Sequence, residues 1–251
     1  MPANKLIKMP VDCVLIIGGG RWARAYLEHL CVLTSPTTEI FVHTLNNIEG
    51  MSQWIKKNNF QQNVRIIPDL DVFPIKRNHP VFVVNSSSHH EKATYWAIER
   101  SLPILGEKPL AMSLKKALSL EKSAVKNGAF LNLSNVFLHS QQLPLVLEQV
   151  ESLKPLKSIE IVWSDFANEV RHGEIKSFDA SVPVFVDVIP HVSSLMSVIS
   201  QTSKFILTSL SLDNGGSFVR MELLANGVSY NITMDRLGGS RQRERTVANR
   251  S

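Results

Sequence analysis

The sequence predicts an α/β protein with two parts: a doubly wound parallel sheet, then an α+β domain with an open, mostly antiparallel sheet. The first part is predicted by a short apolar run, 14–17, followed by three consecutive glycines and a helical pattern. Further short apolar runs alternate with helical patterns as far as residue 133, as in a parallel sheet. The second part is predicted by a change beyond Val136 to longer segments of alternating polarity.

The glycines fit the pattern G-x-G-x-x-A, with Gly18, Gly20 and Ala23 at the three small positions. The first glycine permits a tight turn, the second lets the backbone approach a pyrophosphate, and a small third residue lets helix pack on strand. The N-terminus of the next helix faces the phosphates in such folds. A glycine-rich turn without a ligand is the competing interpretation. The position between strand and helix favours a Rossmann-type dinucleotide site that includes Gly18, Gly19, Gly20, Arg21 and Trp22.

The rest of the first part alternates between the two kinds of element. Strands are expected at 39–44, 65–67, 81–84, 103–105 and 130–133, and helices at 51–58, 91–100 and 114–126. Ser113 is expected to cap the last of these helices, which Asn127 and Gly128 end. This order predicts a dinucleotide-binding domain over residues 1–136.

The second part has a different pattern. Helices are expected at 144–152 and 187–200, with a polar loop between residue 165 and the second helix. Strands are expected at 158–165, 205–212, 218–225 and 229–234, the last two joined by the hairpin turn Asn226-Gly227. We therefore predict an α+β substrate and oligomerisation domain over residues 137–251.

Composition and charge exclude several classes of protein. The chain has 251 residues, of which 44% are hydrophobic and 20% charged, as in ordinary globular proteins. No apolar run approaches the roughly 20 residues of a membrane helix, so no membrane partner and a cytoplasmic location are expected. The two cysteines, Cys13 and Cys31, form no metal or redox motif. Most of the net charge of +5 lies in residues 236–251, which hold five arginines and one acid. This tail is read as solvated and lacks groove-reading elements, so no nucleic-acid partner is predicted.

The end of the second predicted strand bears on the cofactor. An acid about 20 residues past the glycines commonly holds the ribose 2′-hydroxyl of NAD. Here the strand ends in a run without a carboxylate: His43, Thr44, Leu45, Asn46 and Asn47. A 2′-phosphate would not be repelled, and Thr44 and the asparagines offer hydrogen bonds, although no arginine clamps it. We predict NADP as the preferred cofactor over NAD.

Three motifs resemble the Gfo/Idh/MocA oxidoreductases, the glucose–fructose oxidoreductase and inositol dehydrogenase family. The first is IIGGGRWA around the glycines, with Trp22 in the place that many relatives give to tryptophan. The second runs from His90 through Ala97 to the sequence Glu-Lys-Pro-Leu at 107–110. The third is D-x-x-x-H at Asp187 and His191. The resemblance covers almost the whole chain.

The resemblance implies an NAD(P)-dependent dehydrogenase or reductase. Lys108 would lie between nicotinamide and substrate, and His191 would be the general acid/base, a role that suits the pKa of histidine. Asp187 would orient the substrate or the histidine; four residues apart on a helix, the two share a face. The remaining cofactor contacts would come from Asn85, Ser86, His90, Glu107 and Lys108 itself.

Each catalytic residue also has a simpler interpretation. The alternative for Lys108, the strongest catalytic candidate, is a strand-end lysine facing water. Asp187 could instead be the N-cap of a helix whose first turn holds Pro190. His191 reads as a core or surface histidine. His89 and His90 point apart on a strand and lack a third ligand, so no metal is predicted.

Departures from the family pattern leave the substrate and the activity open. Asn85-Ser86 stands where relatives often have Thr-Pro, Val182–Val186 where many have glycines, and Asn135-Val136-Phe137 where relatives often have a basic residue. Together these differences suggest a less polar pocket than a sugar dehydrogenase needs. A small-molecule carbonyl or imine is expected as substrate. The rival function is a catalytically silent dinucleotide-binding relative that acts as a sensor or scaffold. The chain is shorter than the family norm, so either a natural short member or a truncated product is expected. Relatives often associate through the C-terminal sheet, so a homo-oligomer is expected there.

Overall fold

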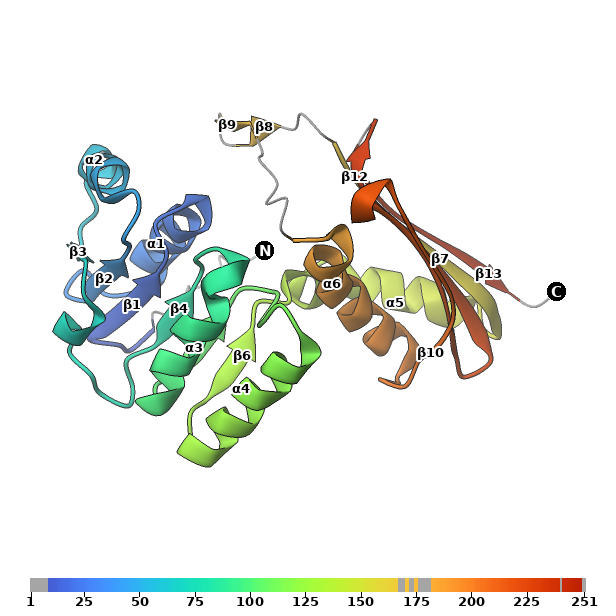
Figure 1. Cartoon of the computed structure of the whole chain (residues 1–251), viewed down its shortest axis with the longest axis horizontal. Coiled ribbons are helices and arrows are strands. Elements are labelled where there is room, and N and C mark those ends of the chain that lie inside the picture. The colour runs from blue at the N-terminus through green and yellow to red at the C-terminus, as the bar shows by residue number, and fades with distance from the viewer. Residues whose placement is uncertain (1–8, 167–169, 172–173, 176–181, 240, 250–251) are drawn as a thin grey trace, which may run out of the picture. The chain divides into compact units, whose positions relative to one another are not determined.

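The structure is a computed structural model that describes residues 9–166, 170–171, 174–175, 182–239 and 241–249. The chain divides into two compact units, Met1–Ser134 and Asn135–Ser251 (Figure 1). The division lies two residues before the domain boundary expected from the sequence.

The first unit contains a six-stranded parallel sheet with the strand order β3-β2-β1-β4-β5-β6. Its strands are β1 (Cys13–Ile17), β2 (Glu39–His43), β3 (Asn63–Ile67), β4 (Val81–Val83), β5 (Ile104–Gly106) and β6 (Leu131–Leu133). Its helices are α1 (Arg21–Leu33), α2 (Ile48–Asn58), α3 (His90–Glu99) and α4 (Leu114–Asn127), with short 3-10 helices η1 (Leu70–Val72) and η2 (Ser87–His89).

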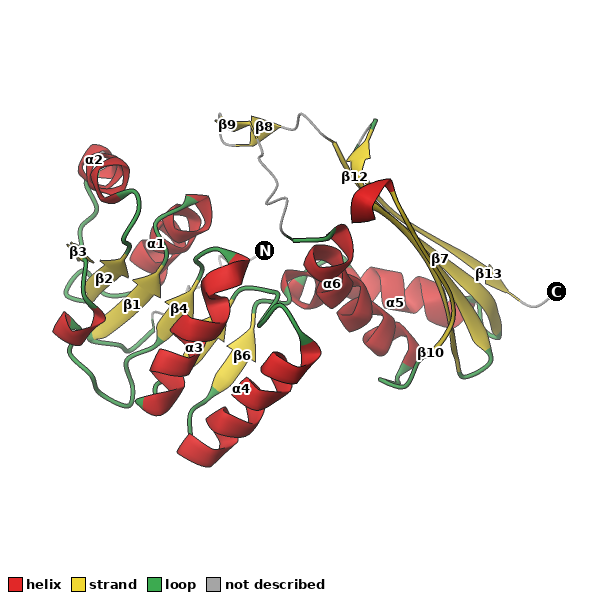
Figure 2. Ribbon diagram, in the orientation of Figure 1, coloured by secondary structure: helices red, strands yellow, loops and turns green. Residues whose placement is uncertain are grey.

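Helices cover both faces of this sheet (Figure 2). On one face, Val14 and Ile16 of β1 pack with Leu27 of α1 and with α2. On the other face, Leu15 of β1 packs with α3 and α4. Both faces of β1 are therefore buried, which explains its continuous apolar sequence. The strand order reverses between β1 and β4, so the predicted doubly wound sheet is confirmed and its switch point lies at the end of β1.

The second unit contains a five-stranded mixed sheet with the strand order β10-β11-β12-β7-β13. Only β12 and β7 pair in parallel; the other neighbours are antiparallel, as predicted for most of this sheet. The strands are β7 (Leu156–Phe166), β10 (Ile206–Asp213), β11 (Phe218–Ala225), β12 (Val228–Gly238) and β13 (Gln242–Asn249). The unit also holds η3 (Val136–His139), α5 (Leu143–Ser152), α6 (Val184–Ser200), η4 (Asn214–Gly216) and the two-residue strands β8 (Val170–Arg171) and β9 (Glu174–Ile175).

One face of this sheet is buried and the other is exposed. Helices α5 and α6 lie against one side of the sheet (Figure 1). Apolar residues of β7, β11 and β12 pack there, and Tyr230 and Met234 are almost fully buried. The opposite face bears exposed polar side chains such as Glu160, Glu222 and Asn231. The alternation of the strands therefore separates core from surface as the sequence predicted.

Helix α6 begins earlier than expected. It starts at Val184, so Asp187 lies inside the first turn and Pro183 is the N-cap. The interpretation of Asp187 as the N-cap is therefore wrong, and Pro190 stands in the second turn, where it has no N–H to donate. The reason is packing: Val184, Val188 and Val192 form one buried stripe that overrides the low helix propensity of valine.

The expectation of a solvated arginine-rich tail is also wrong. Residues 242–249 form β13, an edge strand that pairs with β7 over its whole length. Arg236, near the end of β12, has only 8% of its surface exposed, and Arg243 on β13 is partly buried. The polar loop expected before α6 falls largely on residues outside the described part. No helix among the described residues is long and apolar enough to cross a membrane.

Candidate functional site

A pocket of about 650 Å³ lies at the carboxyl ends of β1, β2 and β4. One wall is the glycine turn after β1, and a second is the loop between β2 and α2. The third wall begins at Asn85 and Ser86 after β4 and continues along α3. The pocket thus occupies the switch point of the sheet, where ligands bind in open α/β folds.

Steric contacts require glycine at two positions of the turn. Gly18 has a φ of +150°, and a Cβ there would lie 2.9 Å from the carbonyl group of Val84. A Cβ on Gly19 would lie 2.1 Å from Oγ1 of Thr44. The turn is therefore packed tightly against β4 on one side and against the end of β2 on the other.

Gly20 differs, because a Cβ built on it would meet no atom within 4 Å. Its backbone φ of −92° suits any residue, and it serves as the N-cap of α1. No side chain caps the first N–H groups of that helix, and no acid lies in its first turn. The open space and the uncapped helix N-terminus together form a cradle that an anion such as a pyrophosphate would fill.

The loop after β2 is fixed to the glycine turn. Nδ2 of Asn47 donates a 2.8 Å hydrogen bond to the carbonyl oxygen of Gly19. Thr44 is 7% exposed and packs on the same glycine. The amide of Asn47 thus holds the turn, while Thr44, Leu45 and Asn46 form the pocket wall.

A buried acceptor lies across the pocket. Oδ1 of Asn85 is buried and has no hydrogen-bond partner among the described residues, while Nδ2 lies 3.5 Å from the carbonyl oxygen of His89. A buried acceptor without a partner is costly unless a ligand or water supplies a donor. The cradle at Gly20 and this acceptor fit a dinucleotide, which has phosphates and amide donors.

Lys108 follows the neighbouring strand β5 and stands between two anchored residues. Glu107 is buried; its N–H donates to the carbonyl oxygen of Val83, and its Oε1 accepts a 2.7 Å hydrogen bond from the hydroxyl of Tyr26. Burial and the nearby carboxylate raise the pKa of Tyr26, so its hydroxyl stays protonated and able to donate. The segment that carries Lys108 is thereby tied to β4 and to α1.

The other anchor is His90, at the start of α3. Its ring is 2% exposed, with Nδ1 2.7 Å from the carbonyl oxygen of Pro109 and Nε2 2.9 Å from that of Asn85. His90 therefore joins the ends of β4 and β5 through their backbones. In this structure the ring contacts the chain segments that carry Lys108 and Asn85, and its contact with the cofactor stays a prediction.

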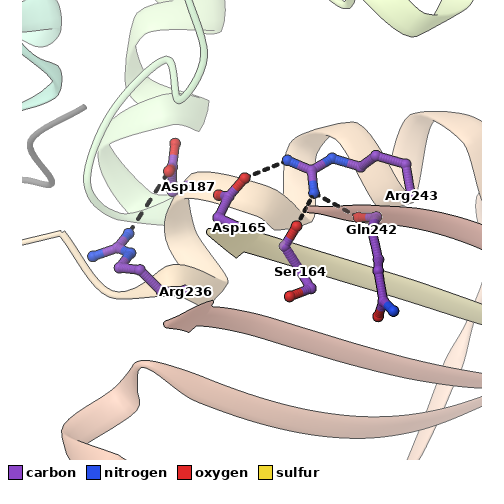
Figure 3. A network of polar contacts seen from close by, with 6 residues as sticks. All are labelled: Ser164, Asp165, Asp187, Arg236, Gln242 and Arg243. Atoms are coloured by element: carbon purple, nitrogen blue, oxygen red, sulfur yellow. Dashed lines mark hydrogen bonds and ion pairs between the residues drawn. The ribbon is translucent and has the colours of Figure 1, made fainter. Parts of the chain in front are cut away.

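Asp187 and His191 lie on α6 of the second unit. Nη2 of Arg236 is 3.7 Å from Oδ2 of Asp187 (Figure 3). Nη1 of the same arginine donates to the carbonyl oxygen of Val182. The carboxylate of Asp187 keeps 31% of its side-chain surface exposed. The arginine therefore contacts this acid while leaving it accessible.

The ring of His191 belongs to an aromatic cluster and is 7% exposed. It stacks on Trp163 with 5.3 Å between ring centroids and an interplanar angle of 11°. Phe137 contacts the histidine edge-on at 5.0 Å. The cluster fixes the orientation of the imidazole, which is a requirement for a general acid or base and equally a property of a core histidine.

Sequence reasoning missed a second ion pair beside this cluster. The guanidinium of Arg243 lies 3.8 Å from the centroid of the Trp163 ring and pairs with Asp165, whose side chain is 4% exposed (Figure 3). It also donates to the carbonyl oxygen of Ser164. The alternation of charged residues in 242–249 is a weak strand signal, so only the structure reveals these contacts.

The structure brings most of the predicted cofactor contacts into one pocket. These are Gly18, Gly19, Gly20, Arg21, Trp22, Thr44, Asn85 and Ser86. His90, Glu107 and Lys108 lie next to the pocket, on the segments that follow β4 and β5. The wall formed by His89, Lys92, Ala93 and Trp96 of η2 and α3 was not predicted, although its helical spacing was visible in the sequence.

Fold and pocket together define a two-unit protein with a pocket at the switch point of the parallel sheet in its first unit. The same fold occurs in myo-inositol dehydrogenase from Lactobacillus casei, solved in complex with NAD(H) and myo-inositol: 15% identity, TM-score 0.75, covering 95% of this chain and 72% of that one. Myo-inositol dehydrogenase from Corynebacterium glutamicum matches with 13% identity and a TM-score of 0.74 over 95% and 73% of the two chains. UDP-N-acetylglucosamine 3-dehydrogenase from Acidithiobacillus ferrooxidans matches with 15% identity and a TM-score of 0.71, over 96% of this chain and 75% of that one.

At these identities the likeness is one of fold. The sequence matches no protein-family model, and no curated protein matches it. The predicted fold class, a Rossmann-type domain followed by an α+β domain with an open sheet, is confirmed.

Proposed function

We propose that the protein is an NAD(P)-dependent oxidoreductase of the Gfo/Idh/MocA family. The observation that carries the proposal is the pocket at the switch point, with the open cradle at Gly20 and the buried acceptor on Asn85. The fold is that of dehydrogenases, one of them solved with NAD(H). The sequence motifs at Glu107–Pro109 and at Asp187–His191 support the same family.

The proposed reaction moves a hydride between nicotinamide and a small-molecule carbonyl/alcohol or imine/amine. The bound cofactor supplies the hydride acceptor or donor. Lys108 would hydrogen-bond the oxygen or nitrogen whose charge changes, and its ammonium would stabilise developing negative charge. His191 would move the companion proton, and Asp187, held by Arg236, would orient the substrate. The cluster of Trp163 and Phe137 would keep the imidazole in position.

Thermal unfolding with and without cofactor tests the proposal most directly. A ligand at a hundred times its Kd stabilises the folded state by about 2.7 kcal/mol, which for a protein of this size raises Tm by about 5–10 °C. We expect shifts of this order with both cofactors at equal concentration. The shift with NADPH should exceed that with NADH, because the pocket wall after β2 carries no carboxylate.

Two other outcomes would contradict this proposal. A cooperative melt that neither cofactor shifts would exclude the dinucleotide pocket. A clear shift without turnover on a panel of polyols, sugars and imines would favour the catalytically silent relative, a cofactor sensor or scaffold. A larger shift with NADH than with NADPH would overturn the cofactor preference alone.

We also propose that two copies of the chain associate through the C-terminal sheet, at the edge of β10. The open face of this sheet is polar, whereas β10 pairs only with β11 among the described strands and is exposed along its length. An antiparallel pair of β10 strands in which Leu207 lies opposite Leu210 brings exposed apolar side chains of the two copies together. Such a pair would be related by a two-fold axis and would cover the exposed edge of each sheet.

The substitution Leu210→Lys tests this association. Leu210 is 47% exposed, so lysine costs little stability in the monomer but introduces a pair of buried charges at the two-fold contact. Sedimentation velocity should show a concentration-dependent dimer for the natural chain and a monomer for the variant. Leu114→Lys, at a 75% exposed position of the first unit, should remain dimeric. A variant that still dimerises would rule out this edge as the interface.

A further inference from the structure

We propose that α3 and η2 carry a phosphomonoester subsite within the dinucleotide pocket, in which Lys92 binds the 2′-phosphate of NADP. The inference rests on the proposed function, and it assigns the recognition of this phosphate to the wall opposite the β2–α2 loop.

Residues of one helical face line this wall. His89, Lys92 and Trp96 are spaced by three and four residues, so they share a face of the helix. All three line the pocket, together with Ala93 between them. The basic residues stand at the N-terminal end of α3, where the helix dipole also favours an anion, and the indole stands one turn further on.

The charge of Lys92 is uncompensated. Its ammonium forms no ion pair with any described residue, although basic neighbours do: Nζ of Lys116 is 2.6 Å from Oε2 of Glu91, and Nη2 of Arg100 is 3.7 Å from Oδ1 of Asp71. Among the described lining residues of the pocket, none is acidic, and Arg21 is a second cation without an acidic partner. The pocket therefore attracts a ligand with several negative charges.

The position of α3 places Lys92 near the adenosine end of the pocket. The pair Arg100–Asp71 links α3 to η1, which follows β3, and Leu70 of η1 also lines the pocket. The guanidinium of Arg100 lies 4.5 Å from the centroid of the Trp96 ring, which fixes the indole in the same wall. The α3 wall is thus linked to the chain that follows β3, the neighbour of β2, and the adenine ribose binds at the end of β2 in this fold.

The two cations suit two different phosphate groups. Arg21 stands at the N-terminus of α1 beside the cradle at Gly20, the place of the pyrophosphate. The loop after β2 offers Thr44 and Asn46 but no cation. The positive charge that a 2′-phosphate requires is therefore supplied by Lys92 from the facing wall.

Binding of two adenosine fragments isolates this contact from the nicotinamide. Adenosine 2′,5′-bisphosphate and adenosine 5′-monophosphate differ only in the 2′-phosphate, and calorimetric titration gives the Kd of each. We expect the natural chain to bind the bisphosphate more tightly than the monophosphate. Lys92→Gln should raise the Kd of the bisphosphate by about tenfold, equivalent to about 1.4 kcal/mol. The Kd of the monophosphate should change by less than about twofold. Lys92→Glu should reverse the order of the two fragments.

Lys115→Gln is the matched control, since it removes an exposed lysine from α4 without touching the pocket. Unchanged selectivity in Lys92→Gln would overturn the inference, as would an equal loss for both fragments, which would place the lysine at the 5′-phosphate. Titration of the natural chain and the same variants with NADH and NADPH distinguishes failure of this inference from failure of the proposed function. If the natural chain binds neither dinucleotide, the proposed function itself fails.

Discussion

Replacing Lys108 by alanine is expected to lower turnover by about a hundredfold to a thousandfold while dinucleotide binding persists. The ammonium would stabilise charge on the reacting oxygen or nitrogen, and removal of one such group costs this much in enzymes. The segment is held from both sides, by Tyr26 on Glu107 and by His90 on Pro109. The truncation should therefore remove the charge without moving the backbone. Initial rates on the best substrate of a polyol, sugar and imine panel measure the effect.

One control variant and one binding measurement accompany this experiment. Lys126→Ala, near the end of α4, should keep full activity, and the Tm shift with NADPH should be the same in all three proteins. Full activity in Lys108→Ala would show that Lys108 does not have the proposed catalytic role. Loss of the Tm shift together with activity would instead show that Lys108 acts in cofactor binding.

The first unit could be predicted almost completely because its signals are local. Each strand is a short apolar run, and each helix has an apolar stripe or a cap, such as Ser113, whose hydroxyl accepts from the N–H of Lys116. The glycine turn fixes the start of α1, since Gly18 has a conformation that other residues rarely adopt. Local signals of this kind are consistent with the tertiary packing, so sequence and structure agree.

The second unit was harder to predict because its boundaries depend on tertiary contacts. Val184–Val186 has β-branched residues, and only their packing against the sheet makes them the first turn of α6. Strand β13 is rich in charged residues and lacks a clear apolar alternation. It forms because β7 presents a free edge and because Arg243 finds Asp165 and the Trp163 ring there.

Residues of the candidate site that belong to a recognisable motif were predicted from the sequence. Residues outside such motifs were missed. The spacing of Gly18, Gly19 and Gly20 predicts the pocket. The spacing of Ala93, Trp96 and Ala97 in the helix expected at 91–100 is typical of a face that packs on the core. In the structure the indole is only partly buried and lines the pocket beside Lys92. Helical periodicity predicts on which face of the helix such a residue lies. It does not predict whether that face packs on the core or lines a pocket.

The substitution Gly20→Ala should separate binding from folding. Its Cβ would enter the open cradle, meeting no protein atom within 4 Å, but it would occupy the space that the pyrophosphate needs. We expect NADPH to bind about tenfold to a hundredfold more weakly, the effect of forcing one extra carbon into a packed contact. Stability of the free protein should fall by less than about 1 kcal/mol, the scale of an N-cap change. Titration with NADPH and thermal unfolding without ligand measure the two effects.

Two other glycines provide the comparison. Gly18→Ala should lower Tm even without ligand, because the added Cβ would meet the Val84 carbonyl group at 2.9 Å in a conformation that suits glycine. Gly239→Ala, which also has open space around its Cβ, lies in the second unit and should change neither property. If Gly20→Ala binds NADPH as tightly as the natural chain does, the cradle is not a phosphate site, and the dinucleotide must be placed elsewhere in the pocket.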